Sequence, residues 1–269
     1  MVRVNTDLVV LNVTVADANG KYAHGLKKSD FKLFEDGREQ TITSFSAEET
    51  PFAAAVLLDT SGSMESRITM ARSAAIRFLD GLREDDVAAV YRFDSKIEQV
   101  QEFSPSKDLA PVAFGLQAKG MTALNDAIVK AARDLSDRSE KRKAIIVLSD
   151  GADTYSSASM DKALSNALAA GATIYTVDMS QMGSRDRQIG AGALRNFAQK
   201  TGGRYVSTPG GQQLREAFAS IVEELSNQYT LTYRSTNRAR DGKWREVGVK
   251  LERSEMVART RKGYRAPKD

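Results

Sequence analysis

Short apolar segments alternate with helical segments from Phe52 onward, and this alternation is the feature that most restricts the fold. The predicted strands are residues 52–58, 86–93, 97–102, 143–149, 172–178 and 203–207. Helical periodicity marks residues 65–82, 124–135, 194–198 and 211–226. Strands that alternate with helices form a mostly parallel sheet with helices on both faces. The middle of the chain is therefore predicted to be a Rossmann-like, doubly wound α/β domain.

The two ends of the chain have a β-rich texture, in which β-branched residues alternate with polar ones between Asn-Gly and Asp-Gly turns. Predicted strands are residues 8–17, 31–35, 40–46, 229–233, 244–251 and 256–260. Each end alone has too few strands to bury a sheet, so the ends are expected to pair with each other. We predict that residues 1–51 and 227–269 form one discontinuous β-sandwich, into which an α/β domain of residues 52–226 is inserted. Tyr233 and Trp244 are expected to be core residues of the sandwich.

The composition excludes several classes of protein. The 269 residues are 41% hydrophobic, which is enough to fill a core. Lys and Arg number 39 against 35 Asp and Glu, but the two signs are interspersed, which predicts a solvated surface and no nucleic-acid partner. Without cysteine there is neither a disulfide nor a zinc–thiolate site. No apolar run reaches the roughly 18–20 residues of a membrane span, and no signal-peptide segment follows Met1. The chain is expected either to be cytosolic or to begin after a removed signal or anchor.

Several enzyme classes lack their motifs. His24 is the single histidine, and no Gly-x-Ser-x-Gly segment occurs, so a serine triad is not expected. No phosphate-binding Gly-x-x-x-x-Gly-Lys-Ser/Thr segment occurs either. The segment Gly190–Gly192 has Arg195 where a dinucleotide loop needs a small residue, and it is interpreted as a helix start. We therefore predict no catalytic residue and no nucleotide cofactor.

Five oxygen-donor side chains lie after predicted strands or at a predicted helix start. They are Asp59, Ser61, Ser63, Thr122 and Asp150. Because the carboxyl ends of parallel strands meet at one edge of a sheet, the three loops are expected to converge. Mg²⁺ prefers near-octahedral oxygen ligands, and Mn²⁺ accepts the same set. The sequence therefore predicts a Mg²⁺ or Mn²⁺ site, with enough positive charge left to bind a partner's carboxylate.

Some polar residues in and near this motif also have a structural interpretation. The hydroxyls of Ser61, Ser63 and Thr122 are also typical of a network that caps helix N-termini. Asp153 lies near the motif but outside it, and is expected to be a loop or capping residue. Three methionines in nearby loops, Met64, Met121 and Met182, are expected to rim a protein-binding surface.

The order Asp-x-Ser-x-Ser, then Thr, then Asp resembles the metal-ion-dependent adhesion site of the von Willebrand factor type A domain. The resemblance covers about residues 52–226 and includes the segments Gly120–Leu124, Leu148–Gly151 and Thr201–Tyr205. The flanks resemble a bacterial, Acidobacteria-type subgroup through the segments Gly25–Gly37 and Arg261–Tyr264. The resemblance implies a non-enzymatic, divalent-metal-dependent binding or adhesion module whose protein ligand supplies an Asp or Glu side chain. It also implies an extracellular or periplasmic place, secreted or surface-anchored, rather than a cytoplasmic one.

Two other functions are compatible with the same sequence. One is an intracellular scaffold or assembly subunit that docks through the sandwich. The other is a metal-dependent hydrolase, for which Glu65 or Asp153 would have to serve as the general base. The identity of the ligand and the oligomeric state are left open by the sequence.

Overall fold

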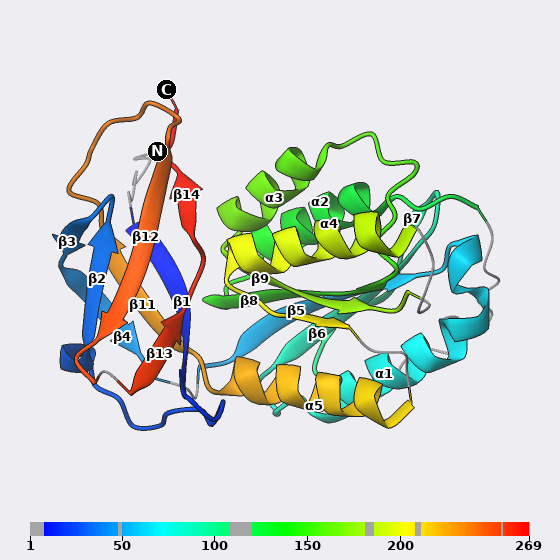
Figure 1. Cartoon of the computed structure of the whole chain (residues 1–269), viewed down its shortest axis with the longest axis horizontal. Coiled ribbons are helices and arrows are strands. Elements are labelled where there is room, and N and C mark those ends of the chain that lie inside the picture. The colour runs from blue at the N-terminus through cyan, green and yellow to red at the C-terminus, as the bar shows by residue number, and fades with distance from the viewer. Residues whose placement is uncertain are drawn as a thin grey trace. The chain divides into compact units, whose positions relative to one another are not determined.

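The structure, a computed structural model, describes residues 8–47, 50–107, 120–180, 186–207, 211–253 and 255–268. The chain divides into two compact units, one continuous and one made from both ends (Figure 1). The continuous unit is Pro51–Leu225, and the other combines Met1–Thr50 with Ser226–Asp269. Among the described residues, no helix has the length and apolar character needed to span a membrane.

The continuous α/β unit is built on a six-stranded sheet in the order β10-β9-β8-β5-β6-β7. The strands are β5 (Phe52–Asp59), β6 (Val87–Phe93), β7 (Ile97–Ser104), β8 (Arg142–Ser149), β9 (Ala172–Asp178) and β10 (Tyr205–Ser207). Neighbouring strands are parallel except for β6 and β7. The chain leaves β5 toward β6 and returns on the other side at β8, so the strand order reverses between β5 and β8. Such a switch point is where open α/β sheets form their ligand crevice. The predicted fold class is confirmed.

Helices cover both faces of this sheet (Figure 1). One face carries α1 (Ile68–Asp80) and α5 (Gly211–Ser226), and the other carries α2 (Leu124–Ser136), α3 (Met160–Ala169) and α4 (Asp186–Thr201). Every residue of β5 is buried, and alternate side chains enter the two cores. Val56 packs in the core with α1 and α5, whereas Leu57 packs in the core with α2, α3 and α4. This two-sided burial explains why β5 is a continuous apolar run.

The helices depart from the predictions in two places. Helix α3 was not predicted; its buried residues are mainly small alanines such as Ala163 and Ala167, which give a weak periodic signal. Ser159 caps it, with its Oγ accepting a hydrogen bond from Lys162 N at 3.2 Å. The helix predicted to begin at residue 65 starts instead as the 3₁₀ segment η2 (Gly62–Arg67), which leads into α1.

Buried polar contacts hold the end of α5 against the sheet. The hydroxyl of Tyr175 on β9 donates to Glu224 Oε1 at 2.8 Å, and both residues are buried. At the start of β8, Arg142 Nη1 donates to the carbonyl of Leu225 at 2.9 Å. Burial lowers the pKa of the Arg142 guanidinium to about 10. A cation at the carboxyl end of a helix offsets the helix dipole, so this contact stabilises the last turn of α5.

The second unit is a sandwich of two four-stranded antiparallel sheets, β13-β1-β11-β4 and β14-β12-β2-β3. Its elements are β1 (Leu8–Asp17), η1 (Lys28–Asp30), β2 (Phe31–Glu35), β3 (Arg38–Gln40), β4 (Ile42–Ser46), β11 (Tyr229–Arg234), β12 (Trp244–Leu251), β13 (Met256–Arg259) and β14 (Gly263–Arg265). As expected, strands from the two ends of the chain pair, β1 with β11 and β2 with β12. One core of buried residues, including Leu11, Leu33 and Tyr229, lies within this unit.

Two chain segments change sheets at the sides of the sandwich. The prediction of one strand over residues 40–46 was wrong, because β3 pairs with β2 and, after Thr41, β4 pairs with β11 in the other sheet. In the same way β13 pairs with β1, whereas β14 pairs with β12. Each side of the sandwich is therefore crossed by a segment that belongs to both sheets.

The two expected aromatic core residues have different environments. Tyr233 is fully buried, which confirms the prediction, and its hydroxyl donates to Glu35 Oε2 at 2.7 Å. The prediction for Trp244 was wrong, because this side chain is 38% exposed. Its indole lies over Gly263, where an added Cβ would be 2.6 Å from the ring, so the space for Trp244 depends on a glycine in the neighbouring strand.

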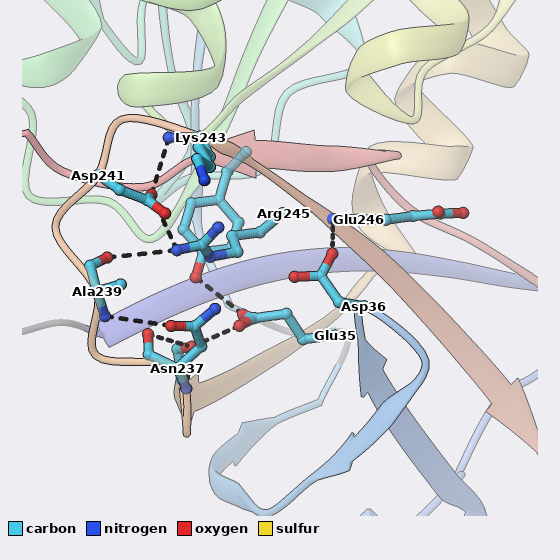
Figure 2. Close-up of polar contacts among 10 residues, drawn as sticks. Glu35, Asp36, Asn237, Ala239, Asp241, Lys243, Arg245 and Glu246 are labelled. Carbon is cyan, nitrogen blue, oxygen red and sulfur yellow. Dashed lines mark hydrogen bonds and ion pairs between the residues drawn. The ribbon is translucent and has the colours of Figure 1, made fainter.

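Glu35 and its neighbours join the two flanking segments that carry the subgroup resemblance. Glu35 Oε2 also accepts a hydrogen bond from Tyr264 Oη at 2.8 Å. The next residue, Asp36, accepts one from Glu246 N at 2.8 Å, beside the Arg245 contact to Asp241 Oδ1 at 2.9 Å (Figure 2). These motif residues therefore have a structural role in pairing the two ends of the chain.

The Tyr175 contact leads to a test of how α5 is held. We expect Tyr175→Phe to lower the free energy of unfolding by about 1–3 kcal/mol, because Glu224 Oε1 loses a buried donor. The matched control is Tyr155→Phe, whose side chain is 52% exposed and which should change stability by less than about 0.5 kcal/mol. Urea denaturation of both variants measures the difference. Equal stabilities would contradict the assigned role of the contact.

Candidate metal centre

Three loops meet at the carboxyl ends of β5 and β8, where the strand order reverses. The loop after β5 is joined to the loop before α2 by the Gly62 N–H, which donates to the Gly120 carbonyl at 3.3 Å. Thr122 joins the loop before α2 to the loop after β8, because its carbonyl accepts the N–H of Thr154 at 2.9 Å. The expected convergence of these loops is therefore observed.

Asp59 is a fully buried carboxyl group at the end of the central strand. Its Oδ1 accepts a hydrogen bond from Ser61 N at 2.9 Å, and its Oδ2 accepts one from the Ser149 hydroxyl. Burial raises the pKa of Asp59 from 3.8 to about 6; the charge of Asp150 adds to the rise, and the hydrogen bonds from Ser149 and Ser61 oppose it. Among the described residues, no Lys or Arg forms an ion pair with Asp59. A cation at this position would therefore compensate a buried charge.

The hydroxyl oxygens of Ser61 and Ser63 lie 3.2 Å apart, beside Asp59. Ser61 occupies the N-cap position of η2, yet its side chain makes no capping hydrogen bond. The position before α2 is occupied by Ala123, which has no side-chain cap either. The capping-network interpretation is therefore not supported in the part of the chain that the structure describes.

Other residues cap α2. Asp153 Oδ2 accepts a hydrogen bond from Asn125 N at 2.7 Å, and Ser156 Oγ accepts one from Asp126 N at 3.0 Å. The interpretation of Asp153 as a capping residue is confirmed. The hydroxyls of Ser61 and Ser63 are thus not needed to cap α2; they contact each other, and the Ser61 side chain also hydrogen-bonds to Asp59.

Thr122 and Asp150 complete the set of five. Thr122 is buried, with its N–H donating to Thr154 Oγ1 at 2.9 Å. Asp150 is half-buried, and its Oδ1 accepts a hydrogen bond from Ala152 N at 3.4 Å. Within the described residues, no three Asp, Glu, His or Cys side chains form a cluster that suits a metal ion. Two carboxylates with three neutral hydroxyls fit a hard divalent cation that keeps part of its charge.

Two residues that shape this centre were not assigned to it from the sequence. One of them, Gly190, was interpreted as part of a helix start, which was wrong because α4 begins at Asp186. Ser149 accepts a hydrogen bond from Gly151 N at 3.0 Å while it donates to Asp59, and so links β8 to β5. Gly190 in α4 packs directly against the Asp150 backbone, where an added Cβ would lie 2.2 Å from the Asp150 carbonyl oxygen. The serine was visible as a neighbour of Asp150, but the glycine contact depends on tertiary packing that no local pattern indicates.

A comparison with protein families found a match within the α/β unit. Residues 54–152 match the family model described as von Willebrand factor type A domain. The matched region holds all five candidate ligands. A comparison with curated proteins found no match.

Solved structures with the same fold include three bacterial proteins. A von Willebrand factor type A protein from Catenulispora acidiphila is 14% identical, with 98% of this chain and 75% of that chain covered and a TM-score of 0.54. The vWF domain of the type V pili tip protein Mfa5 from Porphyromonas gingivalis is 13% identical, with 65% of this chain and 95% of that chain covered and a TM-score of 0.55. The PilB minor pilin from Streptococcus sanguinis is 15% identical, with 66% of this chain and 62% of that chain covered and a TM-score of 0.54. At these identities the likeness is one of fold.

Two glycines of α4 provide a matched test of how Asp150 is positioned. Gly190→Ala should lower the free energy of unfolding by about 1–3 kcal/mol and weaken Mg²⁺ binding, because backbone atoms of Asp150 and Gly151 must move. Gly192 has no atom within 4 Å of an added Cβ, so Gly192→Ala should instead stabilise the helix by about 0.5–1 kcal/mol. Urea denaturation and calorimetric titration with Mg²⁺ measure both effects. The packing argument fails if the two variants behave alike.

The pKa of Asp59 predicts how the stability of the metal-free protein depends on pH. The folded state holds the proton between the unfolded pKa of 3.8 and the folded pKa of about 6, so stability falls as the pH rises through this window. The full loss is on the order of 3 kcal/mol, at about 1.4 kcal/mol for each unit between the two pKa values. Asp59→Asn cannot ionise, so its stability relative to the native protein should rise from pH 4.5 to pH 7. Urea denaturation in a chelator tests this, and a difference that is constant with pH would refute it.

Proposed function

We propose that the α/β unit, of which residues 54–152 match the von Willebrand factor type A model, is a non-enzymatic module that binds a protein ligand through Mg²⁺ or Mn²⁺. The ligand contributes an Asp or Glu side chain. Asp59, Ser61, Ser63, Thr122 and Asp150 would hold the ion, which when bound supplies a fixed positive charge for that carboxylate.

One observation carries this proposal: Asp59 is a buried carboxylate whose compensation among the described residues consists of hydrogen bonds alone. The hydrogen bonds supplied by Ser149 and Ser61 leave the pKa of Asp59 raised to about 6. The nearby hydroxyl oxygens of Ser61 and Ser63 are not used as helix caps. A divalent cation would compensate the charge of Asp59 and would also be coordinated by these hydroxyl oxygens.

The residues of the site also favour binding over reaction. Each carboxylate oxygen of Asp153 already accepts hydrogen bonds, from Ser156 N, Asn125 N and the Ser156 hydroxyl. This arrangement leaves Asp153 poorly placed to act as a general base for the hydrolase alternative. Glu65 lies exposed in η2. The scaffold alternative has no specific observation in its favour.

Relatives of the same fold support a place outside the cytoplasm. One is described as a type V pili tip protein and another as a minor pilin. By analogy of fold, we place this chain in the periplasm or at the cell surface and expect it to interact with other proteins there.

Calorimetric titration with Mg²⁺ and with Mn²⁺ tests the proposal. The native chain should show saturable binding, and Asp150→Asn should weaken it at least about tenfold, because a half-buried ligand oxygen and its charge are lost. Asp161→Asn is the matched control, since Asp161 is exposed in the first turn of α3 and should leave binding unchanged. Native-like binding by Asp150→Asn, with circular dichroism showing both variants folded, would rule out this site.

A further inference from the structure

The α/β unit exposes two large apolar side chains among its described residues, Met121 at 50% and Tyr155 at 52%. Both lie in the loops of the candidate metal centre. Met121 precedes Thr122 in the chain, and the Tyr155 N–H donates to the Thr122 carbonyl at 3.0 Å. The exposed apolar surface of this unit is therefore concentrated beside one candidate ligand.

Hydrogen bonds hold together the backbone segments that carry these two side chains. Thr122 makes hydrogen bonds through both its N–H and its carbonyl to the loop that contains Tyr155. Asp153 and Ser156 tie the same loop to the first turn of α2. A pre-organised surface loses little entropy when a partner binds, which favours a role in recognition.

The methionines expected at the rim of the site have different environments. Met64, expected at the rim, is instead completely buried in the core with α1 and α5. Met182 lies outside the described residues. Of the two that are described, Met121 is therefore the one exposed to solvent, and an exposed apolar pair beside a polar site is typical of a binding surface.

Resting on the proposed function, we infer that Met121 and Tyr155 select ligands in which an apolar side chain lies within two residues of the acidic one. The thioether of Met121 adapts to different shapes, and the ring of Tyr155 offers a flat apolar face. The carboxylate is held at the metal, and the neighbouring apolar side chain packs between Met121 and Tyr155. The ligand class is therefore an exposed acidic residue with an aliphatic or aromatic neighbour, on a loop or an extended segment.

Selection from a library of random twelve-residue peptides displayed on phage tests this inference. The full chain is immobilised in Mg²⁺ and bound phage are eluted with EDTA. The same selection is made on the double variant Met121→Ser, Tyr155→Ser and on the conservative variant Met121→Leu, Tyr155→Phe. Calorimetric titration with Mg²⁺ and thermal melting verify that each protein is folded and retains its metal site.

The native chain and the conservative variant should enrich peptides with an acidic residue and an apolar residue within two positions of it. The serine variant should still enrich acidic residues, with apolar neighbours at library frequency, and should bind a selected peptide at least about tenfold more weakly. Acidic peptides without apolar neighbours from the native chain would overturn the inference and leave the proposed function intact. If EDTA elutes no enriched acidic peptide from the native chain, the proposed function fails and the inference with it.

Discussion

A carboxylate buried at the end of the central strand is the constraint on which the arrangement of the α/β unit depends. Asp59 is the last residue of β5, a strand buried along its whole length, and a buried charge is costly unless it is compensated. The fold supplies hydrogen bonds from Ser149 and Ser61, and these reduce the cost without cancelling it. The surrounding loops bring further oxygen atoms to the same place. A charged Asp59 is thus unfavourable alone, and it becomes favourable when a cation binds to it and to the oxygen atoms of the loops.

The loops around this position divide their polar residues between two tasks. Asp153, Ser156 and Asp126 satisfy backbone N–H groups at the start of α2 and in the loop after β8. Because these contacts complete the helix start, Thr122 and the serines of the first loop are not required for it. The residues that cap α2 are therefore different from the residues whose hydroxyls are candidate metal ligands.

The parallel sheet and the position of the candidate site could be predicted from the sequence, because both depend on local patterns. The apolar runs of β5 and β8 indicated a parallel sheet, and the polar residues that follow them indicated where loops would meet. Local patterns failed where distant residues decide the outcome. Thr41 carries no signal that the strand changes sheets there, and the space that the Trp244 ring occupies depends on Gly263 in another strand. Helix α3 was missed because its buried face is mainly alanine, and the contact of Gly190 with Asp150 arises only when α4 packs.

The discontinuity of the sandwich has a consequence for the order in which the chain can fold. Tyr229 Oη donates to the carbonyl of Ala23, a residue 206 positions earlier, and β1 pairs with β11 in its first part and with β13 in its second. The strands before Pro51 therefore leave the ribosome without most of their partners and must wait until the whole of Pro51–Leu225 has been synthesised. The α/β unit has all its strands within one continuous segment and can form first, which brings the two ends into a shorter effective loop. A chain that stops within the last strands would leave β1 and β2 with unpaired edges, and such edges favour association between molecules.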